Sequence, residues 1–239
     1  MATIELQCTD VTKKFGSLRA LDGVTFKLSG CKIKGLIGPN GSGKTVLLNT
    51  LTKVPYGPDG GKIVFNGKRI DRLKPSQICK LGIARTFQTL TFFPSLTVEQ
   101  NLLVGVKSLG KSRTIVSEAL YLTGLLGKEK YKAASLSFFD LKMLMIATAL
   151  SIDPKLLLLD EPLGGISEDE CTQMLSVIKN INETGRAILI VEHKINEIVN
   201  LCDEMIVLHM GKVIADGEPE KVISQENVLT AYFGGKYNA

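Results

Sequence analysis

The segment spanning residues 38–45 reads GPNGSGKT, which fills the pattern G-x-x-x-x-G-K-[ST] without a mismatch. Glycines in such a loop let backbone N–H groups close around phosphate oxygens, and the following helix directs its positive N-terminus at the same anion. The lysine reaches the outer phosphates, and the hydroxyl after it is available to Mg²⁺. An ordinary glycine-rich turn is disfavoured, because an apolar strand precedes the loop and a helical run follows it. The pattern predicts a nucleotide site made of Gly38, Pro39, Asn40, Gly41, Ser42, Gly43, Lys44 and Thr45.

Two further apolar strands end in polar residues. The run Leu156–Leu159 is followed by Asp160 and Glu161, and AILIVEH ends at His193. Taken alone, either run is as well explained by a core strand, and a lone histidine is usually structural. With the phosphate loop upstream, we predict that Asp160 holds Mg²⁺ through water and that Glu161 polarises the attacking water. Because ligands bind at the carboxyl ends of strands in open α/β sheets, His193 is predicted to contact the γ-phosphate or that water.

Sequence patterns divide the chain into the elements that must position these residues. The first 30 residues alternate apolar and polar types in short runs, and residues 60–70 predict a hairpin with an Asn66–Gly67 turn. Residues 89–150 hold amphipathic helical patterns without a clear strand, and strand–helix alternation then resumes. We therefore predict an α/β fold: a P-loop NTPase core with a mostly parallel sheet (1–88 and 151–239), an N-terminal antiparallel β subdomain within it, and a helical insert (89–150).

Composition excludes several functional classes. The chain has 239 residues, and its 29 Lys and Arg against 24 Asp and Glu are spread without a block of like charge, which argues against a nucleic-acid surface. No apolar run approaches the roughly 20 residues of a membrane helix, and no charged-then-apolar leader begins the chain. We expect a soluble cytoplasmic chain that reaches a membrane only through partners.

The motifs, in this order and over nearly the whole chain, resemble the ATP-binding subunits of ABC transporters. The resemblance implies ATP and Mg²⁺ as ligands, a second ATPase subunit and transmembrane permease subunits as partners, and a peripheral position on the inner face of the cell membrane. It implies that Phe15 stacks on adenine and that Gln88 meets Mg²⁺ and water, although a core phenylalanine and a loop amide are the simpler interpretations. It makes His193 the switch histidine.

Two stretches are similar to the ATPases of branched-chain amino-acid importers, namely ARTFQTLTFFPSLTVEQNLLVG and VLTAYFGG. Urea importers and importers of other polar solutes share these traits. We therefore expect import of branched-chain or other amino acids, with the solute itself determined by other subunits.

One motif departs from the family. Where the family reads Leu-Ser-Gly-Gly-Gln, contacting the nucleotide of the opposite subunit, this chain reads LSFFD, with Ser137 retained. Phenylalanine obstructs close backbone approach, and at ~4 Å the charge of Asp140 would repel a triphosphate by about 1–4 kcal/mol. Alternatively, Ser137 and Asp140 form a variant capping box, and the phenylalanines pack on neighbouring helices. The loop GGIS, called the seam loop because in the family it lies at the seam between the two ATPase subunits, is also unusual. It has Ser167 where the family usually places Asp or Asn.

Two functions remain open at this point. The chain could hydrolyse ATP beside a non-identical ATPase that supplies an intact Leu-Ser-Gly-Gly-Gln motif. It could instead be a nucleotide-binding regulatory subunit with weak hydrolysis, although a sensor needs neither Glu161 nor His193. A soluble ABC ATPase of translation or DNA repair is disfavoured, because such proteins usually carry two cassettes or a long coiled insertion.

Overall fold

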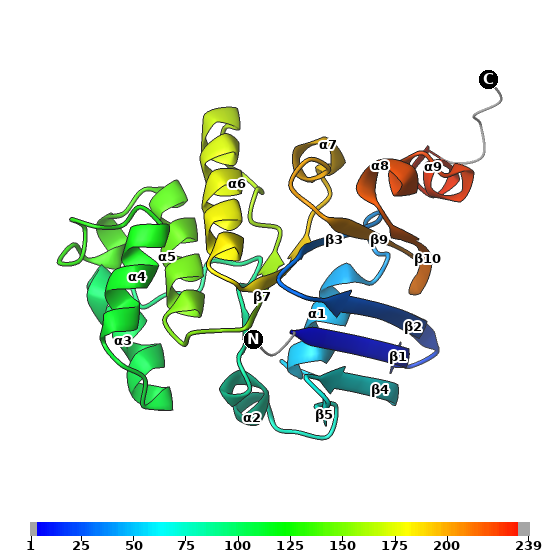
Figure 1. Ribbon diagram of the computed structural model, residues 1–239, viewed down its shortest axis with the longest axis horizontal. Coiled ribbons are helices and arrows are strands. Elements are labelled where there is room, and N and C mark those ends of the chain that lie inside the picture. The colour runs from blue at the N-terminus through cyan, green and yellow to red at the C-terminus, as the bar shows by residue number, and fades with distance from the viewer. Residues whose placement is uncertain (1–3, 234–239) are drawn as a thin grey trace.

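A six-stranded, mostly parallel sheet forms the centre of the computed structural model, which describes residues 4–233 (Figure 1). Gly234 and Gly235, which belong to the VLTAYFGG stretch, lie outside the described residues. The strand order is β10-β9-β3-β8-β7-β6, and only β10 pairs antiparallel. The strands are β3 (Ile33–Ile37), β6 (Ile83–Arg85), β7 (Leu156–Asp160), β8 (Ala187–Val191), β9 (Glu204–His209) and β10 (Lys212–Gly217).

A second, antiparallel sheet of order β2-β1-β4-β5 lies across helix α1 (Lys44–Thr52) from the first. Its strands are β1 (Glu5–Phe15), β2 (Leu18–Ser29), β4 (Gly60–Phe65) and β5 (Lys68–Arg69). Leu47, Leu48 and Leu51 of α1 share one buried cluster with side chains from both sheets, so the helix is held on two sides. Asn66 and Gly67 both have positive φ, 48° and 77°, as a two-residue hairpin turn between β4 and β5 requires.

Helices cover the other face of the parallel sheet, and their side chains form a second buried cluster with it. The segment 89–150 contains α3 (Val98–Leu109), α4 (Thr114–Leu122), the 3₁₀ turn η1 (Ala133–Ser135) and α5 (Phe138–Leu150). The remaining helices are α2 (Pro75–Lys80), α6 (Glu168–Glu183), α7 (Ile195–Ile198), α8 (Pro219–Ile223) and α9 (Glu226–Phe233). Within residues 4–233, no helix has the length and apolar character that crossing a bilayer requires.

The parallel strands set the positions of the predicted chemical groups. Every residue of β3, β7 and β8 is buried, as expected of strands covered on both faces. The phosphate loop follows β3, Gln88 lies three residues beyond β6, Asp160 ends β7, and His193 lies two residues beyond β8. The predicted α/β fold is confirmed, and its parallel register brings these groups to one edge of the sheet.

Candidate functional site

The phosphate loop is pressed against strand β9 at its first glycine. Gly38 has φ +153°, and a Cβ there would lie 2.1 Å from the carbonyl oxygen of Leu208, so no side chain fits. Gly43 (φ +109°) is the residue before α1, and a Cβ there would meet the carbonyl oxygen of Ala20 at 2.6 Å. The two glycines therefore let the loop wrap closely over the N-terminus of α1.

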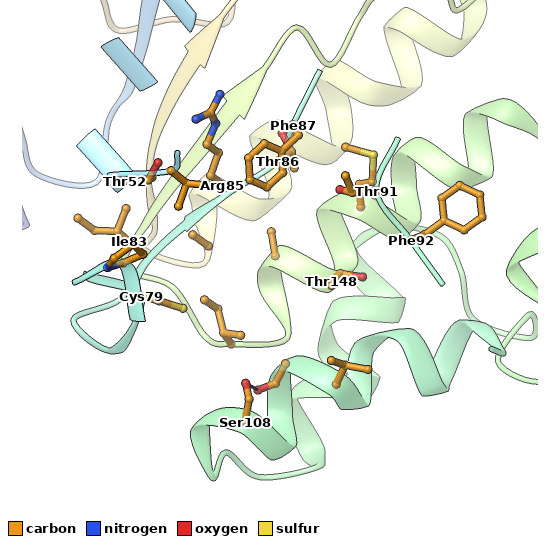
Figure 2. A pocket seen from close by; sticks show the side chains of 18 of the residues that line it. Thr52, Cys79, Ile83, Arg85, Thr86, Phe87, Thr91, Phe92, Ser108 and Thr148 are labelled. Carbon is orange, nitrogen blue, oxygen red and sulfur yellow. Dashed lines mark hydrogen bonds between the residues drawn. The ribbon is translucent and has the colours of Figure 1, made fainter. Parts of the chain in front are cut away.

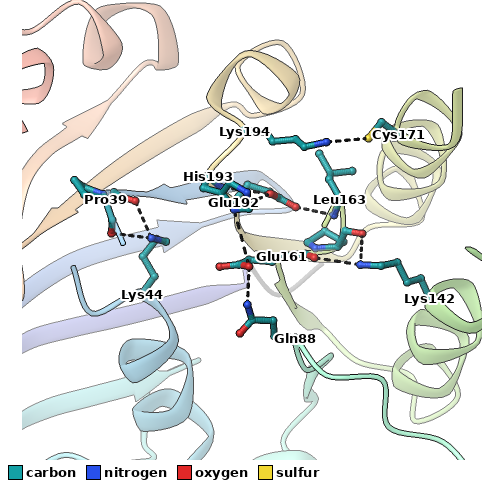
Figure 3. Close-up of polar contacts among 12 residues, drawn as sticks. Pro39, Lys44, Gln88, Lys142, Glu161, Leu163, Cys171, Glu192, His193 and Lys194 are labelled. Carbon is teal, nitrogen blue, oxygen red and sulfur yellow. Dashed lines mark hydrogen bonds and ion pairs between the residues drawn. The ribbon is translucent and has the colours of Figure 1, made fainter. Parts of the chain in front are cut away.

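Lys44 is the first residue of α1, and its side chain lies over the phosphate loop. Its Nζ donates to the carbonyl oxygens of Gly38 at 2.7 Å and Pro39 at 3.1 Å (Figure 3). Burial lowers the pKa of the Lys44 ammonium, and the carboxylates of Glu161 and Asp160 oppose that shift. The hydroxyl of Ser42 is buried and has no hydrogen-bond partner within the described chain, so it is available to a ligand oxygen.

A cleft of about 880 Å³ opens above this loop. Its volume falls in the range of about 300–1,000 Å³ common for small-molecule sites. Many of the predicted site residues line it: Phe15, Asn40, Gly41, Ser42, Gly43, Lys44, Thr45, Gln88, Glu161 and His193. Gly38, Pro39, Asp160 and Ser137 do not line it, although the first three lie directly beneath or beside residues that do.

Phe15 lies at the rim of the cleft and not in a core. The side chain is 43% exposed, which excludes the alternative of a buried phenylalanine. Its ring meets Tyr56 edge-on with a centroid separation of 5.0 Å, and the Lys13 ammonium lies 5.6 Å from its centroid. The exposed part of the ring borders the cleft, where a flat ligand group can stack on it.

Glu161 has a carboxylate in the cleft and a backbone that is held from behind. Gln88 Nε2 donates to Glu161 Oε2 at 2.9 Å, and His193 Nδ1 is 3.9 Å from the same oxygen (Figure 3). Glu161 has φ +49°, a conformation uncommon for a residue with a side chain. Lys142 Nζ, from α5, donates to the carbonyl oxygens of Glu161 at 3.4 Å and Pro162 at 3.0 Å.

Glu192 was not among the residues that the sequence singled out. Its side chain is fully buried, and Oε1 accepts the backbone N–H of Leu163 at 2.7 Å. Oε2 accepts the N–H of His193 at 3.3 Å. Burial raises the pKa of the Glu192 carboxyl, and among residues 4–233 no lysine or arginine forms an ion pair with it. This carboxyl joins the backbone after Glu161 to the backbone of His193, and its place directly before that histidine was the available signal.

Asp160 lies beneath the cleft in an ion pair that sequence reasoning also missed. Arg85 Nη2 donates to Asp160 Oδ2 at 2.7 Å, and the two side chains are 4% and 1% exposed. Burial raises the pKa of Asp160, and the Arg85 guanidinium opposes the rise. The other carboxylate oxygen, Oδ1, is buried without a hydrogen-bond partner among residues 4–233.

These residues fit Mg²⁺ only if a nucleotide supplies further oxygen ligands. The described residues contain no group of three or more His, Cys, Asp or Glu side chains able to hold a metal alone. Asp160 Oδ1 and the Thr45 hydroxyl are hard oxygen donors, and proteins often hold Mg²⁺ with one or two such groups together with phosphate oxygens. The site therefore suits a magnesium ion that arrives with a nucleotide.

The altered motif LSFFD (residues 136–140), called the signature below, contributes no residue to the lining of the cleft. Ser137 caps α5, its hydroxyl accepting the N–H of Asp140 at 3.1 Å, so the predicted cap is confirmed. The Asp140 carboxylate does not complete a capping box, because it pairs with Lys128 Nζ at 2.6 Å. Its charge is therefore partly neutralised, and the repulsion expected from the sequence has to be lowered accordingly.

The first phenylalanine of this signature contacts a loop rather than a helix. Phe138 is 49% exposed, and a Cβ added at Gly165 would lie 3.4 Å from its Cε1. Lys142 Nζ lies 5.5 Å from the centroid of the same ring. Phe139, in contrast, packs partly against the helical core, as the sequence suggested. Ser167, in the seam loop, caps α6 through a reciprocal capping box with Glu170.

Comparison with known proteins agrees with this geometry. The family model described as "ABC transporter" matches residues 21–164. A probable branched-chain amino acid transport ATP-binding protein LivG of Archaeoglobus fulgidus is 33% identical, with 97% of this chain and 96% of that protein covered. The high-affinity branched-chain amino acid transport ATP-binding protein LivG of Escherichia coli K12 is 32% identical, with 96% and 97% covered.

Solved structures give the same result. A nucleotide-free ATP-binding cassette from an ABC transporter superposes with a TM-score of 0.87 at 29% identity, covering 97% of this chain and 99% of that one. The cbiO1 protein of Clostridium perfringens, part of the ABC transporter complex cbiONQ, superposes with a TM-score of 0.84 at 26% identity, covering 94% and 92%. The chain therefore belongs to the ABC transporter family, as an ATP-binding subunit that hydrolyses ATP.

Proposed function

We propose that this chain hydrolyses ATP to power the import of branched-chain or other amino acids through separate membrane subunits. The observation that carries the ATPase part is the single cleft that unites the phosphate loop with Gln88, Glu161 and His193. The solute class is supported by the names of the LivG relatives. The retained Glu161, with its amide and imidazole neighbours, favours hydrolysis over a regulatory role.

Each side chain has a role in the proposed reaction. The main-chain amides of the loop and Lys44 hold the triphosphate, and the exposed ring of Phe15 stacks on the base. Thr45 and Gln88, with Asp160 acting through water, would hold Mg²⁺, and the ion would neutralise phosphate charge. Glu161 orients the attacking water, and the amide of Gln88 fixes the carboxylate for that task. His193, which lies across the Glu161 carboxylate from Gln88 (Figure 3), donates a hydrogen bond toward the γ-phosphate.

A groove of about 830 Å³ suits a membrane subunit (Figure 2). It lies between the segment after β6 and helices α3 and α5, and its lining includes the exposed or partly exposed side chains of Phe87, Phe93 and Val104. We assign it to a short helix of the permease. Gln88 directly follows Phe87, so one segment serves both the groove and the nucleotide cleft. In this proposal the helical segment 89–150 converts closure of the cleft into transport.

The second ATPase subunit is proposed to be non-identical. Phe138 and Phe139 stand where close backbone approach to the partner's phosphate would need glycine, whereas this chain's own cleft keeps all its hydrolytic groups. The complex would then have one hydrolytic site and one slow or binding-only site. The test is to purify the chain with its natural partners and to replace Glu161 and the partner's equivalent glutamate by glutamine, separately. Equal losses of turnover would defeat the asymmetry.

The wider proposal is tested by ATP-driven uptake. Lys44→Ala should abolish both ATP binding by the chain and uptake of labelled leucine by vesicles that contain the complex. ATP-driven uptake that persists in this variant would refute the site. Phosphate release by the complex, with Glu161→Gln as the control, separates an ATPase from a regulatory subunit. Normal leucine uptake in cells that lack the chain would remove branched-chain amino acids as the solute but leave the ATPase intact.

A further inference from the structure

The buried guanidinium of Arg85 joins three elements beneath the nucleotide cleft. Nη2 donates to Asp160 Oδ2 on β7 at 2.7 Å, and Nη1 donates to Asn49 Oδ1 on α1 at 2.6 Å. Arg85 itself ends β6. The planar fork of an arginine fixes the direction of both bonds, which a single ammonium does not do. The three elements are thereby tied at one point.

The two bonds set the orientation of side chains that lie beneath the cleft. Oδ2 of Asp160 accepts the bond from Arg85, whereas Oδ1 has no hydrogen-bond partner among residues 4–233 and is available to a ligand. Thr45 and Asn49 are four residues apart in α1, so they lie on the same side of that helix. Arg85 therefore holds the carboxylate of Asp160 in register with the helix face that carries the Thr45 hydroxyl.

We propose that Arg85 is a positioning residue for Mg²⁺·nucleotide binding, which acts by orienting Asp160 toward the oxygen of Thr45. The inference rests on the proposed role of Asp160 at the metal. Residues that hold a metal ligand in place typically change metal affinity by roughly 10- to 100-fold when replaced. A structural role alone would lower stability without changing the metal requirement.

The experiment measures the metal requirement directly. The full-length chain is held in excess over ATP, so that little nucleotide is free to bind the ion, and is titrated with Mn²⁺ while electron paramagnetic resonance reports the free ion. Arg85→Gln should raise the half-saturating Mn²⁺ concentration by roughly 10- to 100-fold. Arg85→Lys, whose single ammonium reaches only one of the two partners, should raise it less. Folding of each variant is checked by circular dichroism and thermal unfolding.

Arg186→Gln is the matched control. Arg186 is also buried, at 9% side-chain exposure, and also pairs with carboxylates, but its partners are Glu118 and Asp153 and not Asp160. This variant should lose stability and keep the wild-type metal requirement.

The outcomes separate the inference from the function on which it rests. Asp160→Asn should raise the Mn²⁺ requirement, and an unchanged value would remove Asp160 from the metal site. A shift in Asp160→Asn together with a wild-type value in folded Arg85→Gln would overturn only the role of Arg85. Should Arg85→Gln fail to fold, a wild-type value in Arg85→Lys would overturn it equally.

Discussion

Replacement of Lys142 tests whether helix α5, which begins in the LSFFD motif, holds Glu161, the proposed catalytic glutamate, in place. Lys142 is half-buried on α5, and it donates across to the backbone turn that carries Glu161. That turn holds Glu161 at φ +49°. Such left-handed conformations cost roughly 1–3 kcal/mol and persist only where neighbouring groups enforce them. The ammonium of Lys142 is one of those groups.

The size of the effect follows from three contacts. The bond to Pro162, at 3.0 Å, is charge-assisted and worth roughly 1.5–3 kcal/mol. The bond to Glu161, at 3.4 Å, is long and adds little, and the ammonium–ring contact with Phe138 adds about 0.5–1 kcal/mol. Lys142→Met keeps the hydrocarbon stem and relieves the burial of the charge, so we expect a net loss of about 1–2 kcal/mol. If that loss falls on the placement of Glu161, turnover drops roughly tenfold.

Three measurements check this prediction. Urea unfolding of the chain gives the stability loss, equilibrium dialysis gives ATP affinity, and phosphate release by the assembled complex gives turnover. We expect ATP affinity to stay within twofold of the wild type (roughly 0.4 kcal/mol), because Lys142 does not line the cleft. Lys179→Met, an exposed lysine on α6, is the control and should change none of the three. A stability loss with unchanged turnover would refute the link to Glu161.

Two further predictions follow from the same site. Gly38→Ala should lower stability by more than about 2 kcal/mol and abolish ATP binding, because its Cβ would lie 2.1 Å from a backbone oxygen. At Gly41 a Cβ would have open space, so Gly41→Ala should cost only the left-handed penalty of about 1–2 kcal/mol. Urea unfolding of the two variants should therefore differ clearly. Glu192 has a raised pKa in the fold, so its favourable contribution exists below the ordinary glutamate range and is lost as pH rises through the folded value. Glu192→Gln removes that loss, and its stability relative to the wild type should therefore increase with pH over that interval; a constant difference in urea unfolding would contradict this.

The sequence predicted the parts of the site that lie in contiguous motifs. The phosphate loop is one unbroken octapeptide, and Asp160, Glu161 and His193 follow runs of apolar residues that could only be buried strands. The parallel order of those strands then brought their ends together without any further information. The antiparallel β region and the Asn66–Gly67 turn were predictable for the same reason, since local alternation and turn chemistry determine them.

The supporting residues could not be found in this way. Arg85 and Asp160 are 75 residues apart, and Glu192 bonds a backbone N–H that lies 29 residues earlier. Lys142 donates to backbone carbonyls, which carry no side-chain signature. The ion pair of Asp140 with Lys128, which lessens the repulsion expected from Asp140, was missed for a related reason, because Lys128 comes from a loop whose path no periodicity predicts.

The proposed stacking of the base on the half-exposed ring of Phe15 has a consequence for the choice of nucleotide. Its neighbours in the cleft include Leu18, Ala20 and Met210, whose side chains are apolar. A hydrocarbon ring reads the flat face that all purines share and none of the edge groups by which guanine differs from adenine. Discrimination between the two purine triphosphates should accordingly be weak in this chain. The relative concentrations of the two purine triphosphates would then determine which one the chain hydrolyses.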